Sequence, residues 1–225
     1  MGNSTQKFSA MITGATGMVG EGVMLECLKH PSVERVLIVN RKPYPLKHPK
    51  LEECIIPNFL ELDAFTQQLT GYDACFYCAG VSSVGISEAD YVRITYDVTM
   101  HFARTVAHLN PRMTFDFVTG ARTDSSEQGK VMWARVKGKT ENALMKLPFK
   151  GVYNFRPGFM KPMEGQRNIK TIYKIAAILY PLLHLVLPNQ ASTMSDVGLA
   201  MINTVLKGYP KQILEIQDIN TLAKA

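Results

Sequence analysis

The chain has 225 residues, of which 46% are hydrophobic and 20% are charged, and its formal net charge is +6. This balance is typical of a globular fold and excludes an intrinsically disordered chain. Because the basic residues are spread along the chain without an aromatic–basic motif, we expect a solvated surface with one or two anion pockets and no nucleic-acid partner.

Short apolar runs alternate with longer amphipathic segments along the first two thirds of the chain. In chain order we expect a strand at 8–13, a helix at 17–30, strands at 35–39 and 51–56, a helix at 60–69, a strand at 73–78, a helix at 88–109, a strand at 113–119, a helix at 130–147 and a strand at 151–155. Mostly apolar strands separated by helices indicate a parallel sheet covered on both faces. The sequence therefore predicts an α/β fold with a doubly wound sheet.

The pattern changes after Arg156. An apolar segment, "IAAILYPLLHLVL" at 175–187, is followed by a helical pattern at 192–207 with its cap near Ser195, and by a short strand, "QILEI". We therefore divide the chain into a main domain at 1–155 and a small C-terminal substrate cap at 156–225, packed as one compact unit. The apolar segment is shorter than the roughly 18 residues that span a bilayer, so we expect a buried helix or a homodimer surface rather than a membrane span.

Four cysteines, Cys27, Cys54, Cys75 and Cys78, occur in a chain whose start has no leader-like apolar run, so we expect a cytoplasmic protein with reduced thiols. "CFYC" at 75–78 resembles a redox or zinc motif. It lies within an expected strand, however, where side chains three residues apart point to opposite faces. The spacing therefore favours buried structural thiols and no metal site.

The segment "ITGATGMVG" at 12–20 places Gly14, Gly17 and Gly20 between the first strand and the first helix. Such a bend needs residues free to take positive φ, a close approach of backbone to phosphate, and tight packing of helix on strand. The helix N-terminus then offers unpaired N–H groups to a pyrophosphate. In this strand–bend–helix context, the glycines predict a dinucleotide site.

The end of the second strand indicates which dinucleotide binds. An acidic residue there would bond the ribose 2′-hydroxyl of NAD and repel a 2′-phosphate. This strand instead runs into "VNRKP", with Arg41 and Lys42 where an acid would be needed. We therefore expect NADP(H) in preference to NAD(H), the alternative being that both cations are solvated loop charges.

Four short motifs occur in order: "TGATGMVG", "YCAG" at 77–80, "VKGKTE" at 136–141 and "FRPG" at 155–158. Together they resemble the atypical short-chain dehydrogenase/reductases of the NAD-dependent epimerase/dehydratase kind, and in particular the small Tat-interacting-protein-like oxidoreductases. The resemblance covers nearly the whole chain. It implies a Rossmann core, a substrate cleft at the carboxyl ends of the strands, and NADP(H) as cofactor.

The resemblance also assigns residues to roles. Lys137 would bind the nicotinamide ribose, and Thr119 would fall near the catalytic serine, with Ser125 or Ser126 as alternatives. The resemblance implies four further groups of cofactor contacts: a phosphate loop (Gly14, Thr16, Gly17, Met18, Val19 and Gly20), a 2′-phosphate site (Arg41 and Lys42), an adenine site (Asn58 and Phe59) and a ribose and nicotinamide side (Cys78, Ala79 and Gly80).

Two positions depart from the family pattern. Trp133 stands where the catalytic tyrosine would be, four residues before Lys137, and Thr95 occupies an asparagine position. Indole cannot exchange a proton near neutral pH, so Trp133 could stack on nicotinamide, wall the substrate pocket or belong to the core. Tyr91, Tyr96, Tyr153 or a water held by Lys137 could replace the acid, although packing is the more ordinary role for these tyrosines. Lys139 and Glu141 are expected to be solvated helix charges.

Two functions follow from these patterns. The first is an NADP(H)-dependent oxidoreductase or epimerase-like enzyme acting on a small apolar substrate, with Lys137, Thr119 and Trp133 at the catalytic centre. The second is a catalytically silent NADP(H)-binding module that regulates a partner, because the tyrosine is missing. The sequence names neither the substrate nor the partner.

Overall fold

One parallel sheet forms the centre of the computed structural model, which describes residues 6–167 and 191–225. Within these residues the sheet has seven strands in the order β3-β2-β1-β4-β5-β6-β9, and each neighbouring pair is parallel. The chain moves outward from β1 in one direction and then restarts at β4 in the other, which is the doubly wound order of a Rossmann fold. The predicted fold class is confirmed.

Strands and helices alternate along the described chain. In chain order they are β1 (Phe8–Thr13), α1 (Met18–Lys29), β2 (Val33–Asn40), β3 (Leu51–Ile55), a 3-10 turn η1 (Asp63–Phe65), β4 (Ala74–Tyr77), α2 (Glu88–Val92), a π-helical turn η2 (Arg93–Asp97), α3 (Val98–Leu109), β5 (Thr114–Val118), α4 (Met132–Leu144), β6 (Gly151–Phe155), β7 (Phe159–Lys161), β8 (Ala191–Thr193), α6 (Met194–Lys207), β9 (Ile213–Leu214) and α7 (Ile216–Ala223).

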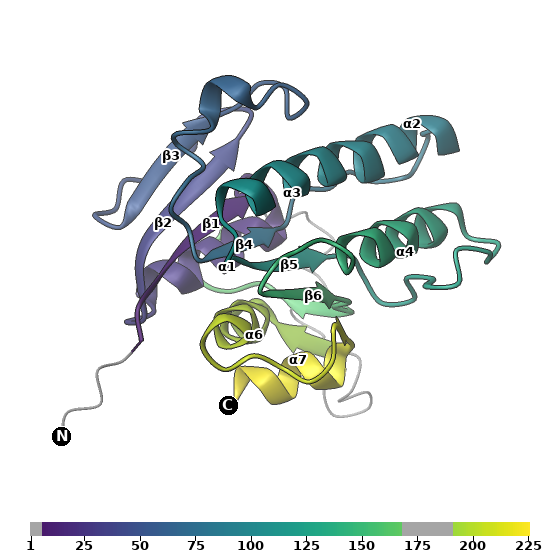
Figure 1. The fold of residues 1–225 in the computed structure, drawn as a ribbon. Coiled ribbons are helices and arrows are strands. Elements are labelled where there is room, and N and C mark those ends of the chain that lie inside the picture. The colour runs from purple at the N-terminus through teal and green to yellow at the C-terminus, as the bar shows by residue number, and fades with distance from the viewer. Residues whose placement is uncertain (1–5, 168–190) are drawn as a thin grey trace.

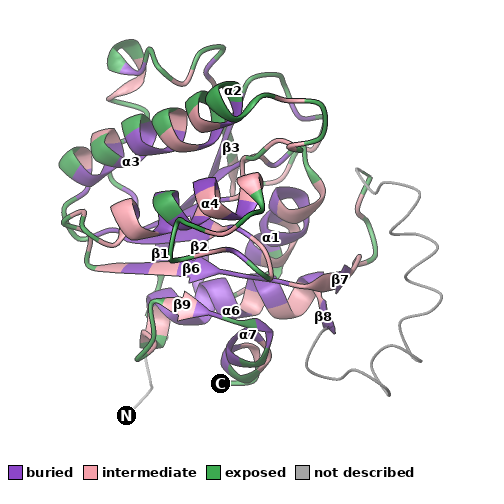
Figure 2. Cartoon of the chain, turned by 90° about the vertical axis from the view of Figure 1, so that its right-hand side faces the viewer, coloured by how far each residue is buried: buried purple, intermediate pink, exposed green. Residues whose placement is uncertain are grey.

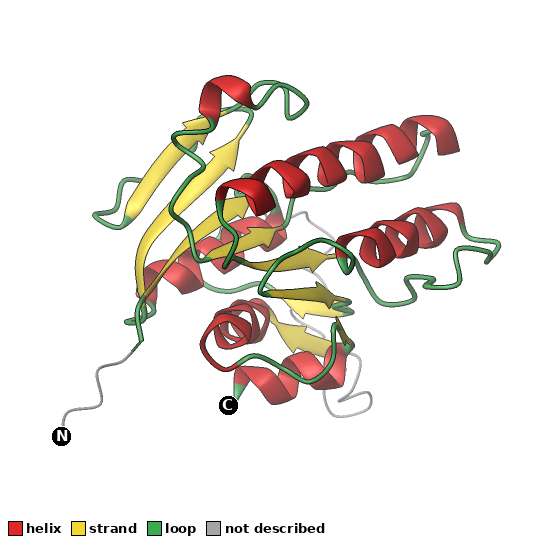
Figure 3. Cartoon of the chain, in the orientation of Figure 1, coloured by secondary structure: helices red, strands yellow, loops and turns green. Residues whose placement is uncertain are grey.

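Helices cover both faces of the sheet, so the molecule has three layers (Figures 1 and 3). Successive strand residues point to opposite faces, and Ile12 accordingly packs with α1 and α6 whereas Met11 packs with α3 and α4. All six residues of β1 are buried. Figure 2 shows the strands buried between the layers, with the exposed side of α3 turned outward. The strands are apolar throughout because both of their faces are covered.

Two of the expected helices differ from the structure. The segment 60–69 forms only the η1 turn, because Asn58, Thr66 and Thr70 use their side chains to bond nearby backbone or Glu61, which competes with a regular helix. The helix expected at 88–109 is present, but its turn at 93–97 is π-helical and joins α2 to α3. Such turns occur often at functional sites.

The described part of 156–225 adds to the main layers. Helix α6 packs on α1, and β9 pairs with β6 at the edge of the sheet. The N-cap of α6 is Thr193, which forms a capping box with Asp196, whereas the sequence pattern placed the cap near Ser195. The apolar segment 175–187 lies outside the described residues. The boundary at 155 and the role of 156–225 as a substrate cap stay predictions.

All four cysteines are free thiols; Cys27, Cys54 and Cys75 are buried as expected, whereas Cys78 is only partly buried. Cys75 packs in the α3–α4 core, and Cys78 packs against the α1–α6 core on the opposite face. Among the residues that the structure describes, no three His, Cys, Asp or Glu side chains gather as a metal site. In the same part of the chain, no helix has the length and apolarity needed to cross a membrane.

Candidate functional site

A tight bend connects β1 to α1 at the carboxyl edge of the sheet, next to the loop that follows β4. Gly14 has φ +71°, and a Cβ there would lie 2.7 Å from the backbone nitrogen of Ala79. The Ala79 N–H donates to Thr13 Oγ1 at 3.1 Å. Only glycine fits this close approach, because both the positive φ and the neighbouring backbone exclude a side chain. The bend lies at the carboxyl ends of β1 and β4, the neighbouring strands between which the strand order reverses. Ligands of such sheets usually bind in the crevice at this point.

The N-terminus of α1 opens into this crevice. Its N-cap, Gly17, provides no side-chain cap, and the first intrahelical bond runs from the Glu21 N–H to the Gly17 carbonyl at 2.9 Å. The N–H groups of Met18, Val19 and Gly20 consequently have no partner within the helix. A Cβ on Gly20 would lie 2.3 Å from the Gly14 carbonyl oxygen, so this glycine allows the helix to meet the bend. The arrangement fits a pyrophosphate.

Two adjoining cavities run along the carboxyl edge of the sheet. The first has a volume of about 350 Å³, and the second has about 520 Å³. Of the sequence-predicted residues, the first is lined by Gly14, Thr16, Gly17, Arg41, Asn58, Phe59, Cys78, Ala79, Gly80 and Lys137. The second is lined by Val19, Cys78, Ala79, Gly80, Thr119 and Lys137. We call the first the ribose cavity and the second the inner cavity. Shared residues make them one continuous groove.

The far end of the ribose cavity contains Asn40 and Arg41, which follow one another at the end of β2. Asn40 is 3% exposed, and neither its amide nitrogen nor its amide oxygen has a hydrogen-bond partner in the described protein. Buried polar groups are normally satisfied, so this amide indicates a ligand or water in the cavity. Sequence reasoning passed over Asn40, although its place before Arg41 was a usable signal.

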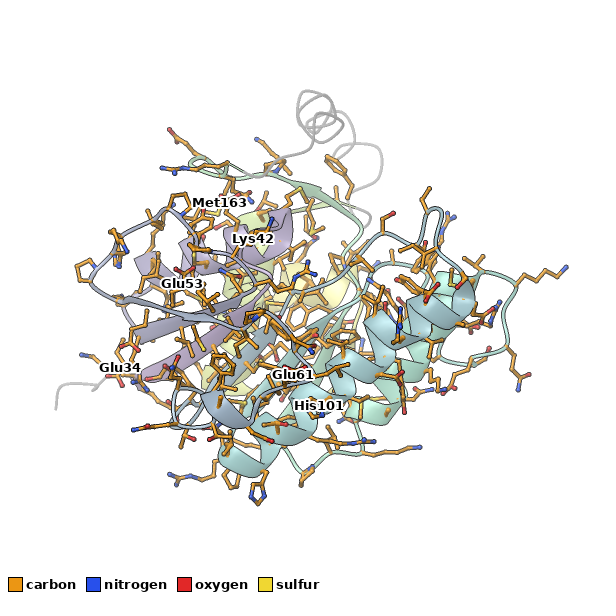
Figure 4. The ribbon with its side chains drawn as sticks, turned by 90° about the horizontal axis from the view of Figure 1, so that it is seen from above. Glu34, Lys42, Glu53, Glu61, His101 and Met163 are labelled. Carbon is orange, nitrogen blue, oxygen red and sulfur yellow. The ribbon has the colours of Figure 1, made fainter. Side chains whose placement is uncertain are left out.

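Lys42 does not line either cavity in the described structure. Figure 4, seen from above, shows Lys42 on the same side of the molecule as Glu53 of β3, and Glu61 and His101 on the α3 side. At the ribose cavity, Asn58 bonds the Leu60 N–H at 3.1 Å and Glu61 at 2.6 Å. The role of Lys42 in cofactor binding stays a prediction.

Lys137 lies at the junction of the two cavities. Its Nζ donates to the Thr119 carbonyl at 2.6 Å, just beyond the end of β5. Burial lowers the pKa of Lys137 from 10.5 to about 8, and the nearby carboxylate of Glu141 opposes that change. The Thr119 hydroxyl donates to Glu141 at 2.6 Å. Lys137 and Thr119 are therefore together at the groove, with the hydroxyl of Thr119 engaged by α4.

Glu141 is fully buried, and the expectation that it is a solvated charge is wrong. Arg156 of the "FRPG" motif donates to its two oxygens at 2.5 and 3.1 Å, and also to Glu215 at 3.1 Å and Ser125 at 2.5 Å. A bidentate pair of this kind has strict geometry. The network joins α4, the end of β6 and the start of α7 directly behind Thr119.

Trp133 is half-buried on α4, one turn before Lys137, and lines neither cavity in the described structure. Its catalytic role stays a prediction. Among the alternative acids, Tyr91 lines the ribose cavity together with Thr95. The Tyr153 hydroxyl instead accepts from the Tyr209 N–H at 3.1 Å.

Lys139, Tyr96 and Ser126 line neither cavity in the described structure. Lys139 lies over the ring of Tyr96 at 4.7 Å from its centroid. Ser126 donates to Asp124 at 2.6 Å within its own loop. Both contacts are local, and a catalytic role for Tyr96 or Ser126 stays a prediction.

Known proteins resemble this chain along most of its length. Protein HTATIP2 of Rattus norvegicus is 24% identical over 157 residues, which cover 69% of this chain and 64% of that protein, so the match spans less than two thirds of the relative. Protein fmp52-1, mitochondrial, of Aspergillus terreus is 23% identical over 210 residues, covering 88% of each.

A solved structure agrees in fold. The Bordetella bronchiseptica enzyme WbmF in complex with NAD⁺ superposes with a TM-score of 0.64 at 14% identity, covering 97% of this chain and 78% of WbmF. The model of the NAD dependent epimerase/dehydratase family matches residues 10–125, just over half of the 225 residues. Its match contains the glycine bend, β2 and the β4 loop. The chain belongs to the NAD dependent epimerase/dehydratase family.

Proposed function

We propose that this protein binds NADP(H) along the groove and acts as an oxidoreductase on a small, largely apolar carbonyl compound or alcohol. One observation carries the proposal. Among the described residues, the only charged side chains that line either cavity are the cations Arg41 and Lys137. A groove without a carboxylate accepts the extra phosphate of NADP(H) without repulsion.

The ribose cavity supports the 2′-phosphate. Asn40 ends β2 directly before Arg41, and its neutral side-chain amide has no hydrogen-bond partner in the described protein. Arg41 follows it with a guanidinium, which can bond phosphate in a bidentate manner. A charge-assisted contact of this kind is worth roughly 1.5–3 kcal/mol. That corresponds to about ten- to a hundredfold in affinity.

The inner cavity supports a small apolar substrate. Its lining side chains are mostly apolar or small and come from α1, β7 and the segments that follow β4, β5 and β6, and Lys137 carries its only charge among the described residues. A bound nicotinamide would supply or accept a hydride there. The protein's own contribution is to hold the cofactor ribose with Lys137, keep water out and orient the carbonyl toward the reacting ring.

Calorimetry with NADPH and NADH tests the cofactor assignment. We expect wild-type protein to bind NADPH more tightly, and Arg41→Ala to weaken NADPH binding about ten- to a hundredfold while NADH binding changes little. Lys47→Ala is the matched control, because Lys47 is an exposed lysine of the same loop that lines neither cavity and has no predicted contact with the cofactor. Equal losses for both cofactors in Arg41→Ala would refute the 2′-phosphate assignment.

A second function, an NADP(H)-binding module without turnover, has one observation in its favour. No tyrosine lines the inner cavity in the described structure, so the usual acid of this reaction class is absent from the place where substrate would bind. Steady-state assays against aldehydes, ketones and quinones with NADPH distinguish the two. Turnover of any of these supports the enzyme, and tight binding without turnover supports the module.

A further inference from the structure

The inner cavity contains few groups that can give up a proton. Its ionisable lining residues are Cys78 and Lys137. Burial, with a smaller contribution from the carboxyl of Asp116, raises the pKa of Cys78 far above its usual range. A thiol with such a high pKa is a poor acid near pH 7, because proton transfer is most efficient when the donor pKa lies near the working pH.

Tyr91 offers no better route. It lines the ribose cavity and not the inner cavity, and it is only 2% exposed. Burial raises its pKa, although a hydrogen bond with Thr95 acts in the opposite direction. Tyr91 therefore bonds a neighbour on its own helix and does not line the cavity that would contain a substrate carbonyl.

The ammonium of Lys137 has the required position. It lines both cavities, so a group bound at their junction reaches it from either side. An ammonium carries three hydrogens, and the described structure gives it one acceptor, the Thr119 carbonyl at 2.6 Å. Two N–H groups remain for the cofactor ribose and for a substrate oxygen.

The surroundings of Lys137 favour proton release. Burial lowers its pKa to about 8, with Glu141 limiting the effect. Glu141 in turn forms an ion pair with Arg156. Titratable and charged groups from five elements surround Lys137: Glu141 of α4, Arg156 after β6, Tyr77 and Cys78 at the end of β4, Tyr91 of α2 and Arg41 after β2.

We propose that Lys137 is itself the catalytic acid, donating a proton from Nζ to the substrate oxygen in place of the missing tyrosine. The inference rests on the proposed reductase function. As the carbonyl carbon accepts a hydride, which NADPH of the proposed function would supply, the π-electron pair of the C=O bond moves to oxygen. That oxygen takes a proton from Lys137, the N–H electron pair stays on Nζ, and water returns a proton to the neutral amine.

The titration of Lys137 tests the inference without turnover. Protein labelled with ¹³C at the lysine ε-carbon is titrated by NMR, alone and with NADP⁺, and the Lys137 signal is assigned from its loss in Lys137→Arg. We expect a midpoint near pH 8, well below the value of about 10.4 of ordinary lysines. A Lys137 midpoint above pH 10 in the complex overturns the inference.

Kinetics of carbonyl reduction provide the second arm. Lys137→Arg keeps a cation for the ribose but cannot release a proton, so kcat should fall about 10²–10⁴-fold while the Kd for NADPH changes little. In wild-type protein, log kcat should decline above pH 8 as the acid is lost, and Lys139→Arg, on the exposed side of α4, should behave as wild type. Retained turnover in Lys137→Arg would overturn the inference.

The two proposals fail in different ways. Wild-type protein that does not bind NADPH refutes the proposed function and the inference with it. Binding of NADPH together with an ordinary Lys137 midpoint, or without reduction of any carbonyl in the panel, refutes the inference and leaves cofactor binding standing. Circular dichroism of each variant checks that a kinetic loss does not arise from unfolding.

Discussion

Gly20 is the residue on which the junction of α1 with the dinucleotide bend depends, and Gly20→Ala tests that junction. The added Cβ would lie 2.3 Å from the Gly14 carbonyl oxygen and 2.5 Å from its carbon. Both atoms belong to the backbone, so no side-chain rotation can relieve the clash. Helix α1 would have to move away from the bend, and with it the N–H groups proposed to bind the pyrophosphate.

The size of the effect follows from two opposing contributions. Alanine is about 1 kcal/mol better than glycine inside a helix. Overpacking against a rigid neighbour costs about 1–3 kcal/mol, occasionally more. Because this contact is far closer than any real Cβ contact, we expect the clash to win, with a net loss of stability of about 2 kcal/mol and weaker NADPH binding by about tenfold or more.

Gly17→Ala is the matched control for stability. Its Cβ would lie 3.4 Å from the same Gly14 oxygen, at the edge of ordinary van der Waals contact, and its φ of −101° suits any residue. We expect its unfolding free energy to stay within about 1 kcal/mol of wild type. Urea unfolding followed by the fluorescence of Trp133, with calorimetry for NADPH, measures both variants. Equal stability of the two variants would refute the steric argument.

Two further predictions concern buried charges. Glu141→Gln should lower the free energy of unfolding in urea by about 3–5 kcal/mol, because it leaves the buried Arg156 without its main partner. In the control Glu215→Gln, the replaced side chain is 52% exposed, so the loss should be at most about 1 kcal/mol. Similar losses in the two variants would contradict the importance of the Glu141–Arg156 pair. Burial raises the pKa of Asp116 well above 3.8, against the hydrogen bond from Thr204, so the folded state holds a proton that the unfolded state releases. Stability should therefore fall as the pH rises above about 4, and Asp116→Asn should remove that decline in unfolding measured from pH 4 to 7; an unchanged pH profile would contradict it.

Local patterns predicted most of the fold, because the relevant physics is local. Apolar runs of strand length, such as "FSAMIT", need covering on both faces and therefore specify the central sheet. The glycine bend is likewise defined within nine residues. The segment 60–69 failed because an apolar spacing at Leu62, Phe65 and Leu69 is compatible with a helix, while the competing side-chain bonds of Thr66 and Thr70 are not visible in a periodicity.

Glu141 shows what sequence patterns leave out. Its burial depends on Arg156, which lies beyond β6 in the chain and reaches α4 only after the sheet has formed. One signal was nevertheless available. Lys137 was expected to face the site, and a residue four positions later lies on the same helical face. The helical face predicted to turn toward the cofactor site therefore also turns toward the protein, where a carboxylate needs a partner.

The four-residue spacing between Trp133 and Lys137 does not place both side chains at the same site. Residues four positions apart on a helix share a face, but they lie about 6 Å apart along its axis. Lys137 has a long side chain that reaches the junction of the two cavities, whereas Trp133, in the first turn of α4, lines neither of them in the described structure. A proton donor at the inner cavity would have to be a group that reaches it. Lys137 lines that cavity and burial lowers its pKa to about 8, so the proposed acid does not depend on the residue type at position 133.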